Sequence, residues 1–221
     1  MINRFLKLVA GACVLALFSG CANQQKTVDY SEYKQANPRS ILILPPLNES
    51  PDVKATYSML SHVTYPLAEA GYYVLPVALV DETFKQNGMT TPADIHQLPT
   101  GKLHDIFGAD AALYVTVSDY GTRYMVISSA TVVTAKASLV DLRSGKTLWT
   151  GAATASSQEN QQNNGGGLIG LLITAAVNQI ISSVQEDAGY PIAGITSARL
   201  LMPYKNGGIL YGPRSPNYGK D

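Results

Sequence analysis

The fold of this 221-residue chain is decided by the apolar run Ile41-Leu42-Ile43-Leu44, which ends at Pro45-Pro46. A short, continuous apolar run of this kind is typical of a strand buried in the centre of a sheet. Proline donates no hydrogen bond to a strand ladder, so the two prolines end the strand. The sequence therefore predicts a central strand here, followed by a turn over residues 48–52.

A helix is predicted directly after this turn. Apolar side chains recur at helical spacing over residues 53–70, and Gly71 provides a C-terminal stop. Pro66 bends this helix or marks its last turn. A second strand is expected over residues 72–77. Three short helices are expected after it, over residues 81–87, 91–97 and 100–107.

The following stretch predicts an antiparallel meander. Strands are expected over residues 109–117, 126–142 and 147–156, the second of them β-branched and roughly alternating. A hairpin turn signal, Asp-Leu-Arg-Ser-Gly-Lys, occupies residues 141–146. The order of elements predicts an α/β (α+β) fold, in which a mixed sheet with a three-stranded antiparallel meander has helices packed on one face.

Working outward to the N-terminus, residues 1–20 have the features of a signal peptide. Arg4 and Lys7 precede an apolar run over residues 8–18, and Ser19-Gly20 stands directly before Cys21. This end resembles the bacterial lipobox, which implies that Cys21 receives a diacylglycerol and an acyl chain, with no other cofactor. A transmembrane anchor is the alternative, but spanning a bilayer takes about 20 apolar residues. By analogy with the sorting of enterobacterial lipoproteins, Ala22 rather than Asp after the cysteine implies the outer membrane, where the domain would lie on the periplasmic face.

Composition limits the classes of partner. Removing Arg4 and Lys7 from the 16 Lys and Arg leaves 14 basic against 16 acidic side chains, so the mature chain would carry a net charge of −2. Such a chain lacks the basic footprint that phosphate backbones need, which argues against nucleic acid. With Cys21 lipidated, no thiol remains for a disulfide, and stability must come from packing.

The remaining segments divide the chain. Residues 21–38 are polar and predict a flexible tether, with a root-mean-square span of about 20–25 Å. A single α/β domain is expected over residues 39–202, interrupted by a mobile Asn/Gln/Gly loop at residues 157–167. Residues 203–221 lack periodicity and predict an extended tail.

Two segments are candidate partner-binding surfaces. Residues 168–184 form an apolar helical stripe that is either a core helix or an interface, and its candidate contacts are Ile169, Leu172 and Ile173. The tail contributes Tyr204 and Tyr211 among prolines and glycines, which suits partner contact but equally fits a disordered end.

Catalytic and metal sites are not predicted. His62, His96 and His104 are scattered and lack a metal-binding motif. Asp81-Glu82 are neighbours whose side chains point apart on a helix, so they indicate a solvated helix start. The glycines of residues 165–167 precede Leu-Ile, where a P-loop needs Lys-Ser/Thr, which favours a hinge. We therefore expect a protein that is not an enzyme.

Two motifs carry a resemblance to known proteins. The strand and turn over residues 41–48 and the Gly-Ala-Asp motif with its strand over residues 108–117 resemble periplasmic domains of the TolB N-terminal type. That group includes the channel lipoprotein CsgG and lipoprotein activators of peptidoglycan synthases. With its lipobox, the chain resembles a family of bacterial outer-membrane lipoproteins that contains a Neisseria vaccine candidate and whose genes often neighbour a CsgG-like lipoprotein.

The resemblance implies an accessory function. It implies an assembly or accessory module of an envelope complex, with a CsgG-like secretion or transport lipoprotein, or further copies of this chain, as partner. Activation of a peptidoglycan synthase is the alternative. The sequence lacks the pair of long amphipathic hairpins from which CsgG builds its barrel, which argues against a pore made by this chain alone.

Overall fold

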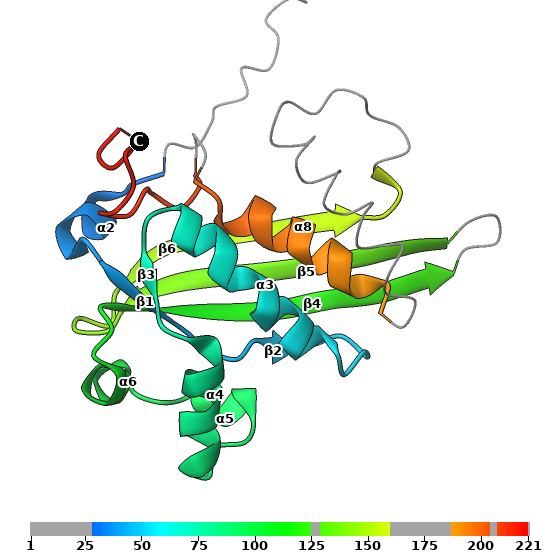
Figure 1. Ribbon diagram of the computed structural model, residues 1–221, viewed down its shortest axis with the longest axis horizontal. Helices are drawn as coiled ribbons and strands as arrows, with labels where there is room; N and C mark the ends of the chain where they lie inside the picture. Colours follow the sequence, from blue (N-terminus) through cyan, green and yellow to red (C-terminus); the bar gives the residue numbers. More distant parts are fainter. Residues whose placement is uncertain (1–27, 125–128, 160–186, 204–206, 221) are drawn as a thin grey trace, which may run out of the picture.

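The computed structural model describes residues 28–124, 129–159, 187–203 and 207–220. Its centre is a mixed sheet with strand order β3-β1-β4-β5-β6, and β2 also pairs with β4 (Figure 1). The strands are β1 (Ser40–Ile43), β2 (Leu47–Asn48), β3 (Tyr73–Val74), β4 (Ala111–Tyr124), β5 (Ser129–Asp141) and β6 (Thr147–Ser156). The helices are α2 (Ser31–Ala36), α3 (Ala55–Glu69), α4 (Val77–Gln86), α5 (Pro92–His96), α6 (Thr100–Phe107) and α8 (Gly189–Leu201). This arrangement confirms the predicted mixed α/β class.

β1 is the central strand that the apolar run predicted. It pairs in parallel with β3 on one side and with β4 on the other. Successive side chains of a strand point to opposite faces, so Ile41 and Ile43 enter one hydrophobic core while Leu42 and Leu44 enter another. All four are fully buried. The run contains no polar residue because both of its faces are covered.

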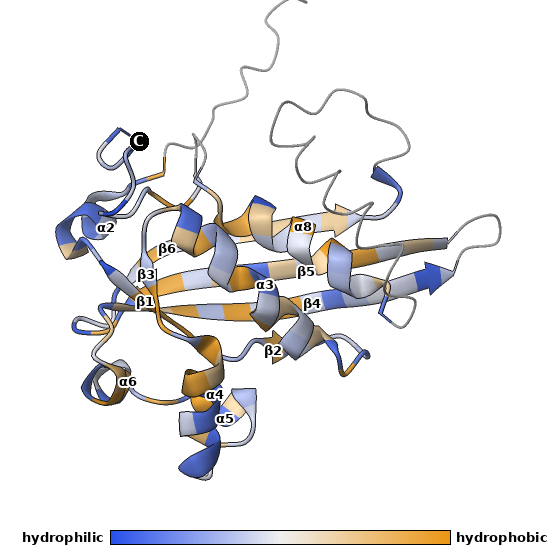
Figure 2. Cartoon of the chain, viewed as in Figure 1, coloured by the Kyte–Doolittle hydropathy of each residue, from blue (hydrophilic) through white to orange (hydrophobic). Residues whose placement is uncertain are grey.

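Helices therefore cover both faces of the sheet, and the expectation of helices on one face is wrong in this respect. Figure 1 shows α3 and α8 lying over the strands on one side, with α4, α5 and α6 grouped on the other. In Figure 2 hydrophobic segments recur along the strands of the sheet, whereas the outer turns of α4 are hydrophilic. The second helical layer is needed because β1 has no polar face to leave in water.

The sheet continues past the two prolines as β2, which pairs with β4 at Leu47 and Thr116. The proline carbonyls obtain partners from two helices. His96 Nε2 lies 2.9 Å from Pro45 O, and Thr56 Oγ1 donates to Pro46 O at 3.2 Å. The interruption of the strand thus becomes an attachment point for helices on both faces of the sheet.

β4, β5 and β6 form the predicted antiparallel meander. β6 has the predicted bounds, whereas β4 continues beyond the expected end to Tyr124. The pairing register shifts between Val117 and Asp119, as at a β-bulge. In the helical part, α3 carries Pro66 near its C-terminal end, and α6 spans the predicted residues.

The N-terminal segment differs from the expected tether. Residues 31–36, which the sequence placed in flexible chain, form helix α2, and Tyr33 is buried in the larger core. The segment is polar on average, but one aromatic side chain suffices to attach it to the body. The folded body therefore includes residues that precede the predicted start at residue 39.

The C-terminal segment also differs from the extended tail that was expected. Over residues 207–220 it forms turns and packs on the connection between α3 and β3. Gly212 N donates to Ala70 O at 2.7 Å, and Arg214 N donates to Gly71 O at 3.0 Å. Ile209 and Leu210 are buried.

Helix α8 has no counterpart among the sequence predictions. It packs on α3 and on the strands β5 and β6. At its start, the Tyr120 hydroxyl lies 2.8 Å from Asp187 Oδ2 and 2.7 Å from Ser58 Oγ, joining α8 to β4 and α3. Burial raises the pKa of the Tyr120 hydroxyl, so this group stays protonated. Within the described ranges, no helix has the length and apolar character needed to cross a bilayer.

Candidate functional site

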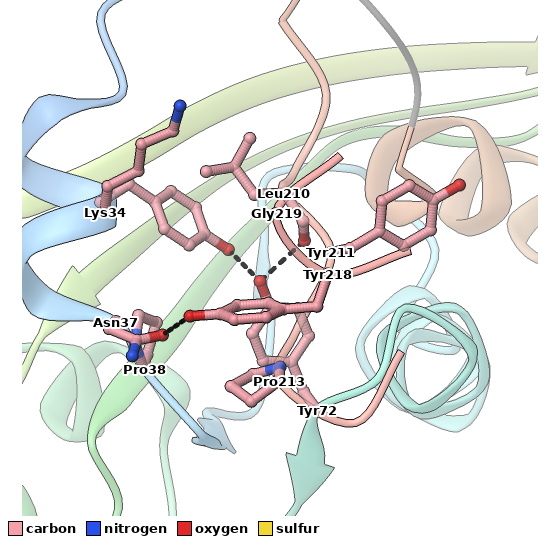
Figure 3. A pocket seen from close by; sticks show the side chains of 10 residues that line it. Lys34, Asn37, Pro38, Tyr72, Leu210, Tyr211, Pro213, Tyr218 and Gly219 are labelled. Atoms are coloured by element: carbon pink, nitrogen blue, oxygen red, sulfur yellow. Dashed lines mark hydrogen bonds between the residues drawn. The ribbon is translucent and has the colours of Figure 1, made fainter. Parts of the chain in front are cut away.

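The two ends of the described chain meet around a cavity of about 300 Å³. Helix α2 forms one wall, the tail forms the other, and Tyr72, directly before β3, contributes to the floor (Figure 3). Its lining combines aromatic rings, prolines and uncharged polar groups with one lysine: Tyr33, Lys34, Asn37, Pro38, Tyr72, Leu210, Tyr211, Pro213, Tyr218 and Gly219. We call this cavity the tyrosine cavity.

A chain of hydroxyl groups fixes its floor. The Tyr33 and Tyr72 hydroxyl oxygens are 2.7 Å apart, and Tyr72 Oη donates to Leu210 O at 2.7 Å (Figure 3). Because the Tyr72 proton is used on Leu210, Tyr33 is the donor to Tyr72. Both tyrosines are buried, so this chain holds the tail against α2 and leaves the ring faces to shape the cavity.

The rim is closed by a second hydrogen bond between the two ends. Tyr218 Oη donates to Asn37 Oδ1 at 2.7 Å. Asn37 follows α2 in the left-handed conformation, with φ of 44°, and its N–H bonds to Tyr33 O as a helix cap. Asparagine tolerates this conformation, and its side chain thereby reaches Tyr218.

Aromatic side chains also hold the tail upstream of the cavity. Trp149 Nε1 donates to Gly207 O at 2.9 Å, and Tyr30 Oη donates to Gly208 O at 2.6 Å. With Tyr72 on Leu210, ring donors from three separate segments of the chain thus satisfy carbonyls of residues 207, 208 and 210 in the tail. The tail is consequently a fixed wall of the cavity.

The chemistry of the cavity suits binding. Tyrosine rings supply apolar contact area at low entropic cost, and hydroxyl and amide groups supply hydrogen bonds. The cavity lining includes neither a histidine nor a carboxylate. Across the described ranges, no cluster of three or more His, Cys, Asp or Glu residues is placed to hold a metal ion.

The three histidines lie apart and serve separate contacts. His96 bonds to Pro45 O, and His104 Nδ1 lies 2.9 Å from Ala109 O. His62 packs on the Tyr190 ring with centroids 4.3 Å apart. Burial lowers the pKa of both His62 and His96 from the ordinary value, which favours the neutral rings.

The acidic pair lies within α4, which begins at Val77, so the expected helix start at residue 81 is wrong; Glu82 is exposed and Asp81 is half-buried. Asp81 forms an ion pair with Lys85 at 2.6 Å, and Glu82 accepts a hydrogen bond from Gln86. Both contacts are between residues four apart on one helix. The two carboxylates therefore serve different neighbours and do not form an acid–base pair.

The Gly-Ala-Asp motif is structural. Gly108 ends α6 in the left-handed conformation, and Ala109 is fully buried. Asp110 then accepts hydrogen bonds from Arg39 N, Ser40 N and Ser40 Oγ at 3.0–3.1 Å, and it pairs with Arg143 at 3.2 Å. Burial raises the pKa of the Asp110 carboxyl, but these hydrogen bonds and the Arg143 charge outweigh it, so the pKa lies below its ordinary value. The motif ties the entry of β4 to the start of β1.

Most of the predicted site residues lie outside the described ranges. These are Cys21, Ile169, Leu172, Ile173 and Tyr204, together with the glycines of residues 165–167 and most of the 157–167 loop. Tyr211 is described, and it lines the tyrosine cavity; its role in binding a partner stays a prediction.

Sequence reasoning missed Tyr33 and Tyr72. Their signal was weak: Tyr33 is an aromatic residue in a polar segment, and Tyr72 directly follows a helix-ending glycine. Neither position belongs to a periodic pattern.

The fold and the cavity define a mixed α/β domain in which the two ends of the described chain enclose a tyrosine-lined cavity. The chain belongs to the GNA1162-like family, described as "Putative lipoprotein GNA1162-like", whose profile matches residues 28–214. It is 50% identical over 208 residues to "Putative lipoprotein NMB1124/NMB1162" from Neisseria meningitidis serogroup B, covering 94% of this chain and 95% of that one. The resemblance to a lipoprotein family with a Neisseria member is thereby confirmed, while the TolB-type domain and a link to CsgG-like proteins stay predictions.

Solved structures give similarities at two levels. The crystal structure of lipoprotein GNA1162 from Neisseria meningitidis matches at a TM-score of 0.54 and 57% identity, covering 66% of this chain and 100% of that one. The LpoB C-terminal domain from Escherichia coli matches at a TM-score of 0.39 and 18% identity, covering 55% of this chain and 85% of that one. The second similarity is too distant to support an argument about function.

Proposed function

We propose that this chain is a lipid-anchored, non-enzymatic accessory module of an envelope protein complex. In this proposal residues 1–20 are removed, and Cys21 carries a diacylglycerol and an acyl chain. The domain is then held on the periplasmic face of the outer membrane. Membership of a lipoprotein family supports the anchor, and so does the basic start and apolar run that precede Cys21.

The observation that carries the proposal is that both ends of the described part of the chain meet around the tyrosine cavity. Tyr33 and Tyr72 form a buried hydrogen-bonded floor, and Tyr211 and Tyr218 stand on the opposite wall. Such a surface suits an extended segment of a partner protein, because rigid rings give apolar contact area at low entropic cost. The anchor would raise the effective concentration of the cavity for partners in the same membrane.

The partner we propose is a CsgG-like secretion or transport lipoprotein. Residues 168–184, through Ile169, Leu172 and Ile173, and Tyr204 in the tail are proposed as additional contacts. Their contribution is separable from that of the cavity, because they can be substituted without changing Tyr33 or Tyr72. Cys21→Ser is expected to release the protein from the membrane fraction if the anchor is correct.

Site-specific photocrosslinking in cells tests the partner. A photoreactive residue replaces Tyr211 in the cavity wall, and a matched control replaces Ile106, which is 57% exposed on α6. A CsgG-like outer-membrane lipoprotein crosslinked from position 211 and not from position 106 is the expected result. An inner-membrane peptidoglycan synthase would instead indicate the alternative function, and crosslinks to a second copy would indicate a homo-oligomer. Hydrolytic turnover by the purified protein would overturn the non-enzymatic assignment.

A further inference from the structure

The shape of the tyrosine cavity limits the kind of segment that it can receive. A helix is about 10–12 Å wide with its side chains, which is more than a cavity of about 300 Å³ can enclose. An added β-strand bonds to the unpaired edge of a sheet, and none of the lining residues belongs to a strand. Among the common modes of peptide recognition, a polyproline II segment in an aromatic-lined groove suits this site.

The lining has the composition that such a segment requires. Four of the lining residues are tyrosines and two are prolines, and they come from both ends of the described chain (Figure 3). Tyr33 and Tyr72 are buried in the floor, whereas Tyr211 is half-buried and Tyr218 is 47% exposed. The rings of Tyr211 and Tyr218 are therefore the ones that a bound segment can reach.

The rim offers a free hydrogen-bond donor. Tyr218 Oη donates to Asn37 Oδ1 at 2.7 Å, which leaves the amide nitrogen of the Asn37 side chain. In the described part of the chain this nitrogen has no partner, and the residue is exposed. No carboxylate lines the cavity to accept a main-chain N–H. Proline presents a carbonyl and no N–H, so a proline-rich segment can accept from Asn37 without bringing a donor that lacks a partner.

The tail shows that this protein already holds one irregular segment by its carbonyls. Ring donors from Trp149, Tyr30 and Tyr72 bond to the carbonyls of residues 207, 208 and 210, which lie outside any helix or strand. Leu210 is the last of these acceptors and also lines the cavity. The cavity therefore continues the row of aromatic groups on which the tail is seated, and a second segment would meet similar chemistry beside it.

We propose that the tyrosine cavity binds a proline-rich segment of a partner protein in the polyproline II conformation. Proline rings of the segment lie on Tyr211 and Tyr218, and one of its carbonyls accepts a hydrogen bond from Asn37 Nδ2. The inference rests on the proposed function, in which the cavity receives a partner's segment, and it specifies the chemistry of that segment. Because polyproline II forms before binding, little ordering entropy is lost in the complex.

Fluorescence anisotropy of labelled peptides tests the selectivity. The full-length lipidated protein in detergent micelles is titrated into a blocked decaproline, and separately into a blocked peptide of the same length with alternating alanine and serine. We expect saturable binding of the decaproline and none of the alanine–serine peptide. Equal binding of the two peptides, or no binding of the decaproline, would overturn the proposal.

The amide donor is tested by Asn37→Asp. This change keeps the acceptor for Tyr218 and tolerates the left-handed backbone, but it removes the N–H groups. We expect decaproline to bind about threefold to tenfold more weakly. Asn217→Asp makes the same chemical change at an exposed tail position outside the lining and should leave binding unchanged. Equal weakening by both variants would contradict the bond from Asn37.

The ring contact is tested by Tyr211→Ala. Loss of a central aromatic contact should weaken decaproline binding about tenfold. The matched control is Tyr65→Ala, because Tyr65 is 62% exposed on α3 and does not line the cavity. If the two alanine variants bound decaproline equally well, the peptide would bind elsewhere on the protein and the proposal would fail.

Crosslinking from position 211 in cells separates this inference from the proposed function. A crosslinked partner peptide that contains a run of prolines supports both. A crosslinked partner peptide without proline overturns the inference about the segment and leaves the accessory function standing. If position 211 yields no partner beyond those of position 106, and decaproline does not bind, both proposals fail.

Discussion

Gly71 and Gly212 pack backbone to backbone, and a Cβ atom built on Gly212 would lie 2.6 Å from the carbonyl oxygen of Gly71. The contact lets Gly212 N reach Ala70 O and lets Arg214 N reach Gly71 O. A Cβ on Gly71 would in turn lie 2.4 Å from Ser215 N. The wall of the tyrosine cavity thus depends on the absence of side chains at two positions far apart in sequence.

We therefore predict that Gly212→Ala destabilises the protein by about 1–3 kcal/mol, because an overpacked contact forces the backbone to shift. Thermal unfolding followed by circular dichroism measures the effect. Gly101→Ala is the matched control, since Gly101 lies within α6 and its added Cβ would meet nothing within 4 Å. That change is expected to be neutral or slightly stabilising. Equal melting temperatures for Gly212→Ala and the unchanged protein would contradict the packing argument.

The hydroxyl of Tyr72 is the link between α2 and the tail. Tyr72→Phe removes the donor to Leu210 O and the acceptor for Tyr33, leaving a buried carbonyl unsatisfied. We expect a loss of about 1–3 kcal/mol in the free energy of unfolding, measured by urea denaturation. Tyr65→Phe, at a position 62% exposed on α3, should change it by less than about 0.5 kcal/mol. If both substitutions changed the free energy of unfolding by a similarly small amount, the hydroxyl chain would contribute little to stability.

Periodic patterns explain why much of the fold could be predicted from sequence. The apolar run of β1, the helical spacing in α3 and the alternation in β5 each arise because a regular element buries one face or two. Each pattern is contained within one segment, so it can be read without knowing the partner segment. The apolar pattern of β1 does not reveal how many helical layers cover the sheet. Full burial of β1 requires helices on both faces, and only the packed structure shows which helices these are.

The tyrosine cavity could not be predicted for the opposite reason. Its walls join Tyr33 to Leu210 and Asn37 to Tyr218, pairs separated by most of the chain. They are held by ring hydroxyls and a side-chain amide, which leave no periodic trace in sequence. The polar segment before residue 39, with its scattered tyrosines, therefore resembles a flexible tether in sequence. The Pro/Gly-rich segment after residue 203 likewise resembles an extended tail. Tyr211 was identified as a candidate because tyrosine suits contact surfaces, without knowledge of what it faces.

Asp110 predicts a dependence of stability on acid. Its pKa is lowered in the folded protein, so the ionised carboxylate stabilises the fold at pH values above its unfolded pKa of about 3.9. That contribution is lost as the pH falls through the lower folded pKa. Asp110→Asn should reduce stability at pH 7 by about 1 kcal/mol or more. The substitution should also reduce the loss of folding stability that accompanies a fall in pH below about 4.

Urea denaturation at a series of pH values measures this difference. Asp105→Asn is a suitable control, because Asp105 is exposed on α6 and carries no hydrogen bond to β1 among the described contacts. If Asp110→Asn and the unchanged protein lost stability in parallel on acidification, the carboxylate would not be the group that secures the start of β1.

His62 and His96 predict a second, milder acid effect. Burial lowers the pKa of both rings in the folded protein, against the opposing hydrogen bonds to Tyr190 and Pro45. Below about pH 6.5 the unfolded chain takes up protons that the folded protein does not, so stability falls as the pH decreases toward the folded pKa values.

Proton resonances of the two rings should therefore titrate at lower pH than a histidine in an unfolded peptide. His96→Gln, which keeps a donor for Pro45 O but does not titrate in this range, should weaken the dependence of stability on pH between 5 and 7. A His96 ring that titrates at or above the peptide value would contradict the neutral state that burial of the ring favours.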